Sequence, residues 1–321
     1  MGPIPTLGLR ISTSLENGGP SCEGYKRQCL QSQPKGFVDP HYPNHALYLK
    51  KPLYGIKQAP RAWYDQLTEY LVINGFSKRQ ANRTLFIKKV EGKLVVAQVY
   101  VDDIIFGSTK DDLAHSFSSM MQTEFEISMI GELNYLLKRQ IWQNNSSIFI
   151  SQTKYANNLV MKFGLESTSL VRTPMSPNVK LTIDLFGKSV DPTLYVSIIG
   201  SLIYLTANRP DISYSVGVCA QYQANPKESH VTDVKHIIKY VKSTSNIGVW
   251  YDKDTNDVLV GYSNADCVSN ADDHKSTSSG CFYLGNNLVS WMIKKKNSIS
   301  LSIAEAEYIA TGSCCTQLFW I

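Results

Sequence analysis

One stretch constrains the fold more than any other. In VVAQVYVDDIIFGS, residues 95–108, two runs of apolar and mostly β-branched residues enclose an adjacent pair of aspartates. Residues of this kind favour strands and Asp suits turns, so the stretch predicts a β-hairpin. A solvated, Asp-rich turn is the simplest interpretation of the dipeptide by itself. The apolar arms, however, place Asp102 and Asp103 at the edge of a core rather than on an open loop.

Adjacent carboxylates at such an edge point to metal chemistry. They repel one another, and a divalent cation beside them relieves the repulsion. Mg²⁺ prefers carboxylate and phosphate oxygens, and two such ions can hold the attacking and leaving oxygens of a phosphoryl transfer. Asp102 and Asp103 are therefore candidate catalytic residues and ligands of Mg²⁺ or Mn²⁺. On this ground alone, an unrelated phosphoesterase is one of the proteins that fit.

Length and composition limit the class of protein. A chain of 321 residues with 43% hydrophobic and 18% charged residues predicts a globular protein of two or three domains. A net charge of +5 is compatible with a nucleic-acid partner without demonstrating one. Seven cysteines without C-x-x-C spacing predict reduced thiols in an intracellular protein of the cytoplasm or nucleus. Neither a secretory signal nor a membrane segment is predicted.

Hydrophobic periodicity predicts mixed helices and strands. Residues 1–34, rich in Gly, Pro and Ser, are predicted to be poorly ordered. Strands are expected near residues 47–49, 93–108, 132–152, 257–267, 280–285 and 287–296. Helices are expected near residues 60–74, 110–125, 153–164, 196–208, 228–244 and 302–321.

Several motifs resemble one family. YVDD, residues 100–103, resembles the catalytic hairpin of reverse transcriptases, and LYGIKQAPRAWYD, residues 53–65, resembles the segment that precedes it in copia-type long-terminal-repeat retrotransposons. GELNYLL, RTPM, IGSLIYLTANRPDISYSV and NPKESHVTDVKHIIKYVKST follow in the family's order. From about residue 35 to residue 321 the chain is identified as similar to the Pol polyprotein of these elements, with a reverse transcriptase followed by the start of a ribonuclease H domain.

The resemblance implies an α+β fold. A partial right-hand polymerase, with palm, fingers and thumb, is expected at residues 35–172. A linker at 173–195 and a helical connection region at 196–256 would then lead to a truncated ribonuclease H-like α/β domain at 257–321. The partners implied are an RNA template, a DNA primer or an RNA–DNA hybrid, dNTP if the enzyme is active, and a complete Pol product of the element. No membrane is expected as a partner.

The family assigns roles to residues of the hairpin and of the segment before it. Asp102 corresponds to the metal ligand, Asp103 to its neighbour, and Tyr100 to the residue against the primer end or the incoming nucleotide. Gln58 matches the position that lines the nucleotide and template pocket.

Two basic residues beside Gln58 have two interpretations. Lys57 and Arg61 are candidate phosphate contacts on physical grounds. A solvated basic face at the start of a helix explains them equally well.

Two departures from the family pattern bear on activity. The two-metal mechanism needs a further aspartate from a segment resembling DVKNAFLNG, and nothing like it precedes Lys35; Asp39 belongs to a later loop. Polymerase activity is therefore expected to be impaired. In NYLLKRQI, Lys138 and Arg139 stand where a glycine and an apolar residue are expected, in a hairpin that holds the primer in the family. They should disturb a close backbone approach, unless both face the nucleic-acid backbone.

The carboxy-terminal segment carries a third departure. Asn264 stands where the family's ribonuclease H domain has a metal-binding aspartate, and an amide lacks the charge that binds Mg²⁺. Asp266 would face the same side of a continuing strand and is a candidate replacement. Glu307 matches the helix glutamate of the cluster, although with Glu305 it also fits a solvated helix face. The later aspartates are expected beyond Ile321, so ribonuclease H activity is predicted to be lost.

Three interpretations remain from the sequence. The chain is an active RNA-directed DNA polymerase, a non-catalytic nucleic-acid-binding remnant of one, or an unrelated phosphoesterase. The extended family motifs argue against the third. The missing upstream aspartate favours the second over the first.

Overall fold

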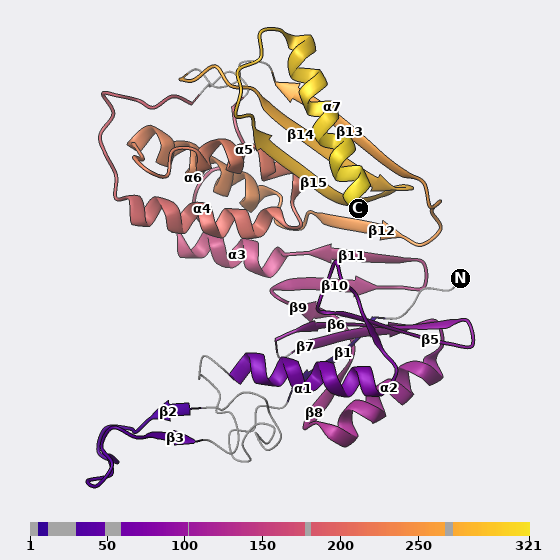
Figure 1. The fold of residues 1–321 in the computed structure, drawn as a ribbon. Helices are drawn as coiled ribbons and strands as arrows, with labels where there is room; N and C mark the ends of the chain where they lie inside the picture. The colour runs from indigo at the N-terminus through magenta and orange to yellow at the C-terminus, as the bar shows by residue number, and fades with distance from the viewer. Residues whose placement is uncertain (1–5, 12–29, 49–58, 102, 177–180, 267–271) are drawn as a thin grey trace. The chain divides into compact units, whose positions relative to one another are not determined.

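The computed structural model describes residues 6–11, 30–48, 59–101, 103–176, 181–266 and 272–321 (Figure 1). Lys57, Gln58 and Asp102 lie outside the described residues. The chain forms two compact units, Met1–Leu133 and Asn134–Ile321, and each is described by itself. The predicted linker at 173–195 lies inside the second unit. The reason is packing: the helix that precedes this segment belongs to the core of the second unit.

The first unit is built on an antiparallel sheet. Among the described residues it has six strands in the order β4-β5-β6-β7-β1-β8. The strands are β1 (Thr6–Ile11), β4 (Ser77–Lys78), β5 (Leu85–Val90), β6 (Lys93–Tyr100), β7 (Asp103–Ser108) and β8 (Ile127–Glu132). A separate two-stranded sheet joins β2 (Leu30–Ser32) to β3 (Ala46–Tyr48).

Two helices, α1 (Ala59–Ile73) and α2 (Asp111–Glu124), cover one face of the large sheet (Figure 1). Leu67 and Leu71, four residues apart and so on one side of α1, are fully buried. In β7, Ile104 and Phe106 alternate toward the same core. The predicted hairpin at 93–108 and helices at 60–74 and 110–125 are confirmed to within a few residues.

The strand β1 corrects one prediction. Residues 1–34 were expected to be poorly ordered, yet Thr6–Ile11 forms a strand inside the sheet, and Leu30–Ser32 forms a second one. β1 pairs with both β7 and β8, and Leu9 is fully buried among the core residues. The alternation of apolar residues in TLGLRI is the signal for this strand, and the surrounding Gly and Pro obscured it.

The second unit contains two sheets and five helices among its described residues. One sheet has the order β12-β11-β10-β9 and the other the order β13-β14-β15. The strands are β9 (Tyr135–Leu136), β10 (Arg139–Gln143), β11 (Ser147–Ser151), β12 (Gly248–Asp252), β13 (Leu259–Asp266), β14 (Thr277–Leu284) and β15 (Asn287–Lys295). The helices are α3 (Thr153–Lys162), α4 (Pro192–Thr206), α5 (Pro210–Ala220), α6 (Glu228–Ser243) and α7 (Ile303–Trp320).

Helices α3 to α6 share one apolar core. Tyr195 and Leu202 of α4 and Ile237 of α6 are fully buried in it. The Tyr195 hydroxyl donates a hydrogen bond to the backbone carbonyl of Cys219 over 2.9 Å, so this large aromatic residue is buried without an unsatisfied polar atom. Within the described residues, no helix has both the length and the apolar character that crossing a membrane requires.

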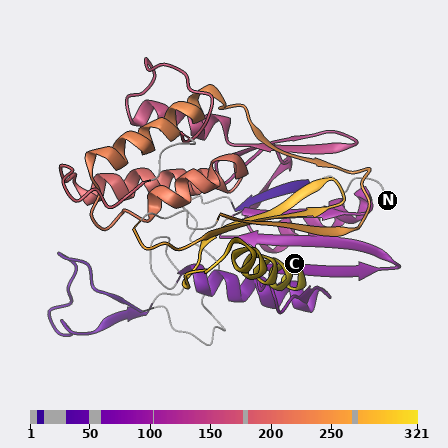
Figure 2. The ribbon, with the colours of Figure 1, turned by 90° about the horizontal axis from the view of Figure 1, so that it is seen from above.

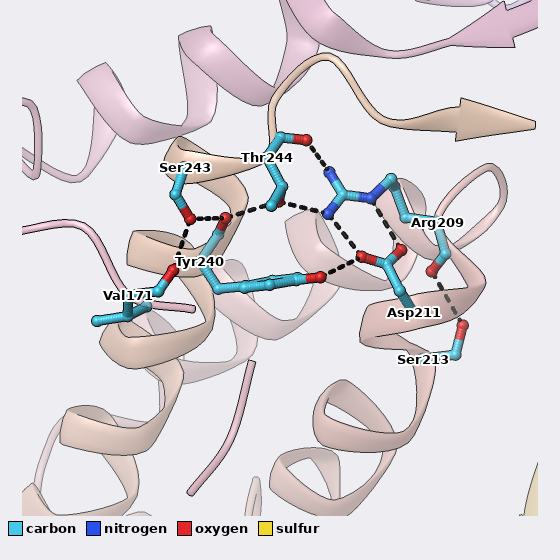
Figure 3. A network of polar contacts seen from close by, with 7 residues as sticks. All are labelled: Val171, Arg209, Asp211, Ser213, Tyr240, Ser243 and Thr244. Carbon is cyan, nitrogen blue, oxygen red and sulfur yellow. Dashed lines mark hydrogen bonds and ion pairs between the residues drawn. The ribbon is translucent and has the colours of Figure 1, made fainter. Parts of the chain in front are cut away.

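A buried arginine ties two of these helices together (Figure 3). Arg209, directly before α5, is only 1% exposed and donates to both carboxylate oxygens of Asp211 over 2.9 and 2.7 Å. The same guanidinium donates to the carbonyl and the hydroxyl of Thr244, at the end of α6, over 2.9 and 2.7 Å. The Tyr240 hydroxyl donates to Asp211 over 3.0 Å. The network joins the amino end of α5 to the carboxyl end of α6.

Helix α7 lies against one face of the β13-β14-β15 sheet (Figures 1 and 2). Ala265 of β13 is buried with Ala306 and Ala310 of the helix. Small residues on both sides allow the helix and the strand to approach closely, as at Gly261, where an added Cβ would lie 2.9 Å from the Cys314 sulfur.

Candidate functional site

The acidic hairpin has a two-residue loop. Tyr100 of β6 pairs with Asp103 of β7, which leaves Val101 and Asp102 between the strands. Favoured two-residue hairpin loops require a positive φ at the first loop residue, and Val101 has a φ of 43°. A β-branched residue in this region is strained, at a cost of roughly 1–3 kcal/mol.

A tryptophan from the neighbouring motif holds the tip. The indole N–H of Trp63, in α1, donates to the backbone carbonyl of Val101 over 3.2 Å. The Trp63 ring meets Phe125 edge to face, with 4.9 Å between ring centroids. The fold therefore brings RAWYD and YVDD together. Trp63 was not among the predicted site residues, although it lies within the motif that carries the resemblance.

The hairpin presents its polar residues on the sheet face that the helices leave open. Ile104 packs toward α1 and α2, so Asp103 and its partner Tyr100 lie on the opposite face by alternation. Tyr100 is 40% exposed. Arg61 is an exposed residue near the start of α1, two residues before Trp63.

The described residues around Asp103 do not fit a two-metal centre. Its cross-strand partners are Tyr100 on β6 and Arg10 on β1, and neither provides a carboxylate. Within the described part of the chain, no group of three or more His, Cys, Asp and Glu residues is placed to hold a metal ion. A centre that holds two divalent ions needs several oxygen ligands.

The strain at the tip leads to a prediction. Replacing Val101→Asn is expected to raise the free energy of unfolding of the first unit by about 1 kcal/mol, because Asn tolerates positive φ and Val does not. Val101→Thr, which keeps the β-branch, is the control and should give no gain. Hydrogen exchange of β6 and β7 measures the effect. Equal protection in the two variants would contradict the assignment of strain.

Lys138, which stands where the resemblance implies a glycine, has a backbone conformation that suits glycine. Lys138 has a φ of 58°, a conformation that glycine adopts without cost. A lysine at this position therefore carries a conformational cost, because its backbone has a positive φ. The Lys138 ammonium lies over the rings of Tyr155 and Tyr204, 5.4 and 5.8 Å from their centroids. These contacts offset part of that cost.

Lys138 gives a second prediction. Lys138→Ala should destabilise the second unit by about 0.5–1 kcal/mol, because the positive φ remains while the cation–π contacts are lost. Lys138→Arg, which keeps a cation over the rings, should cost much less. Urea denaturation of the two variants distinguishes these outcomes, and equal losses would show that the tyrosine contacts contribute nothing.

The predicted ribonuclease H residues lie on β13 and α7. Ala265 faces α7, so by alternation Asn264 and Asp266 lie on the other face of β13. The Glu307 carboxylate instead accepts a hydrogen bond from the backbone N–H of Ala265 over 3.0 Å. Asp266 accepts a hydrogen bond from Tyr214 of α5 over 3.2 Å. Burial, and then the charge of Asp266, raise the pKa of the Tyr214 hydroxyl.

Comparisons with known proteins agree with this architecture. The sequence model of a family described as reverse transcriptase (RNA-dependent DNA polymerase) matches residues 24–177. The chain is 36% identical over 290 residues to the retrovirus-related Pol polyprotein from transposon RE1 of Arabidopsis thaliana, an alignment that covers 90% of this chain and 20% of that protein. It is 35% identical over 295 residues to the corresponding polyprotein from transposon RE2 of the same plant, with coverages of 92% and 20%.

A third relative comes from another plant. The retrovirus-related Pol polyprotein from transposon TNT 1-94 of Nicotiana tabacum is 27% identical over 306 residues, covering 92% of this chain and 23% of that protein. The chain thus spans about a fifth of the length of these curated relatives. The similarity extends across both units, beyond the residues that the family model matches. The chain belongs to the reverse transcriptase family of copia-type transposon Pol polyproteins.

Proposed function

We propose that this chain is a nucleic-acid-binding reverse transcriptase fragment whose first unit is a polymerase palm with impaired catalysis. The observation that carries the proposal is the strand beside the acidic hairpin. β1 reads TLGLRI and pairs with β7 along its length, so the neighbour of the YVDD hairpin contributes no carboxylate. A palm that holds two divalent ions needs a further acidic ligand from such a neighbour.

Family membership supports the substrate class. Reverse transcriptases act on an RNA template, a DNA primer and their hybrid, and the net charge of +5 favours association with a phosphate backbone. Gln58 is the proposed residue of the nucleotide and template pocket, and Lys57 and Arg61 are the proposed phosphate contacts. Tyr100 is the proposed contact with the primer end or the incoming nucleotide. Most of the binding should therefore come from charge and weaken as salt rises.

A second candidate function is active RNA-directed DNA synthesis. The intact YVDD sequence and the hydrogen bond from Trp63 to Val101, which holds the tip, favour it. In this case Asp102 and Asp103 would bind Mg²⁺ or Mn²⁺, and the enzyme would extend a primer with dNTP.

Primer extension on an RNA template separates the two candidates. The chain is compared with the Asp102→Ala, Asp103→Ala double variant in Mg²⁺ and in Mn²⁺, and both are titrated with an RNA–DNA hybrid at several salt concentrations. We expect salt-sensitive binding by both proteins and no extension by either. Incorporation that disappears in the double variant would establish the active polymerase instead. Absence of any salt-sensitive binding would contradict both candidates.

We also propose that the segment from residue 257 onward is a ribonuclease H-like unit that does not cleave RNA in this chain. The carboxylate of Glu307 is engaged with the Ala265 backbone, while Asn264 lies on the other face of β13. Asn264→Asp is therefore expected not to restore hybrid cleavage. Cleavage of a labelled RNA–DNA duplex by that variant would contradict this proposal. It would show that the missing carboxylate at position 264 alone accounts for the loss of ribonuclease H activity.

A further inference from the structure

Aromatic side chains gather on one face of the β9-β10-β11-β12 sheet. Trp142 pairs with Phe149, and Phe149 pairs with Trp250, so a row of aromatic residues crosses β10, β11 and β12. Tyr135 of β9 pairs with Gln140, which lies two residues before Trp142 and therefore on the same face. We call this side of the sheet, with Tyr135, Trp142, Phe149 and Trp250, the aromatic face.

The tryptophans of the aromatic face are accessible. Trp142 and Trp250 are 55% and 49% exposed, whereas Val249, on the opposite face of β12, is buried. Tyr135 is also exposed. Single exposed apolar residues are common, but neighbouring ones on one surface are typical of an interaction site.

The two indoles lean toward each other across β11. Strands that are two apart in a sheet are separated by roughly 9–10 Å. The ring centroids of Trp142 and Trp250 are nevertheless 5.9 Å apart, and Phe149 lies 5.9 Å from Trp250 by the same measure. Gly248 makes room for the Phe149 ring, because a Cβ there would lie 2.9 Å from Phe149 Cζ. The row is thus a compact cluster in which the indoles are the exposed members.

The segment that forms most of this sheet is positively charged. Residues 134–165, which contain β9, β10, β11 and α3, include four basic residues and no Asp or Glu. Lys154 lies at the edge of the aromatic face: its backbone N–H donates to Gln140 Oε1 over 2.8 Å, and its ammonium is 6.0 Å from the Tyr135 ring centroid. Asp252 of β12 lies on the other side of the aromatic row. An anionic ligand is therefore favoured on the Lys154 side.

We propose that the aromatic face binds single-stranded nucleic acid, with unpaired bases stacked on Trp142 and Trp250 and the phosphates on the side of Lys154. Surfaces that bind single strands combine aromatic rings, on which bases stack, with basic residues that contact the backbone. Every base has a flat ring to stack, so the site needs no particular sequence. This site is additional to the polymerase contacts of the proposed function and does not depend on them, because the second unit alone supplies its residues.

Two other roles for the aromatic face make different predictions. If the row only stabilised the sheet through cross-strand contacts, removing a ring would lower stability and leave binding unchanged. If the face bound a second copy of this chain, removing a ring would abolish a dimer. The charge of residues 134–165 argues against the second role, since two copies of a positively charged surface repel each other.

Fluorescence anisotropy of a labelled strand of about 12 thymidines tests the proposal on the full chain. An abasic strand of the same length, which keeps the phosphates and lacks the bases, is the matched probe. We expect the thymidine strand to bind at least about tenfold more tightly than the abasic strand, and Trp142→Ala and Trp250→Ala each to weaken its binding at least about fivefold. Binding of the abasic strand should not change. Equal affinity of the unmodified chain for the two strands would overturn the proposal.

Trp320→Ala is the control, because Trp320 is an exposed tryptophan of α7 in the same unit. It should leave both affinities unchanged, and a loss as large as that of Trp250→Ala would contradict the proposed place of the site. Lys154→Gln should weaken the binding of both strands and lower its salt dependence. Trp250→Phe keeps a ring and should retain most of the binding, whereas Trp250→Leu keeps only apolar bulk and should lose it. These two variants keep the proposal testable if the alanine variants do not fold.

Analytical ultracentrifugation of the unmodified chain and of Trp250→Leu detects a second copy on the aromatic face. A dimer that is lost in the variant would overturn the proposal. Binding of an RNA–DNA hybrid, which tests the proposed function, is measured separately. Loss of the thymidine strand in Trp250→Leu with unchanged hybrid binding would support this site alone, and binding of the thymidine strand without hybrid binding would contradict only the proposed function.

Discussion

Arg209→Ala is expected to lower the free energy of unfolding of the second unit by about 2–3 kcal/mol, because it removes a buried guanidinium and its hydrogen bonds to a partly exposed carboxylate and to Thr244. The loss should be large because Arg209 makes four hydrogen bonds and is 1% exposed. Without the guanidinium, the Asp211 carboxylate would keep only its Tyr240 partner among these contacts, and the Thr244 carbonyl at the end of α6 would lose its donor.

The control for this prediction is Arg172→Ala, an exposed arginine of the same unit. Its replacement should change the unfolding free energy by less than about 0.5 kcal/mol. Arg209→Lys keeps the charge but not the planar fork, so it should fall between the two. Urea denaturation of the three variants provides the measurement. A cost of Arg209→Ala no larger than that of Arg172→Ala would mean that the network in Figure 3 does not stabilise the helices.

Leu9→Ala is expected to destabilise the first unit by about 2–5 kcal/mol, the range for truncating a buried leucine. Leu9 is fully buried in the core under α1 and α2, and its strand is paired on both sides. A large effect is the opposite of what a poorly ordered amino-terminal segment predicts. The variant therefore decides whether β1 belongs to the fold.

Leu47→Ala is the matched control, because Leu47 lies in β3 and is 45% exposed. It should cost less than about 0.5 kcal/mol. Hydrogen exchange of the amides of α1 and α2, which reports on the first unit alone, measures both variants. Unchanged exchange in Leu9→Ala would contradict the place of β1 in the sheet.

The elements that the sequence predicts well are those with a long local period. The arms of the acidic hairpin alternate with period two and α6 carries an apolar stripe with helical spacing, so each is recognisable within its own residues. The residues of β1, however, do not predict which strands pair with it. β1 pairs with two strands that lie far along the chain, so this pairing depends on tertiary packing. A six-residue strand between Gly- and Pro-rich segments has too short a pattern to predict it.

The geometry around the predicted site residues depends on features that the motifs do not state. Tyr100 and Asp103 lie opposite each other because they flank a two-residue loop. Whether Asn264 lies on the same face of β13 as Ala265 and α7 depends on the alternation of the strand, and the family motif does not state which face the helix covers. The positive φ of Lys138 was likewise hidden, because a glycine in a related sequence can mark either close approach or a left-handed conformation.

The place of β1 also sets an order of events during synthesis on the ribosome. Leu9 pairs with Ile104 in β7 and with Met129 in β8, so β1, which is made before both partner strands, has no partner until they have left the exit tunnel. Pairings between such distant segments form slowly because a long loop must close first. During this interval an apolar strand with two open edges is exposed to other chains. Production of the protein should therefore depend on chaperones that shield β1 until its partner strands have been made.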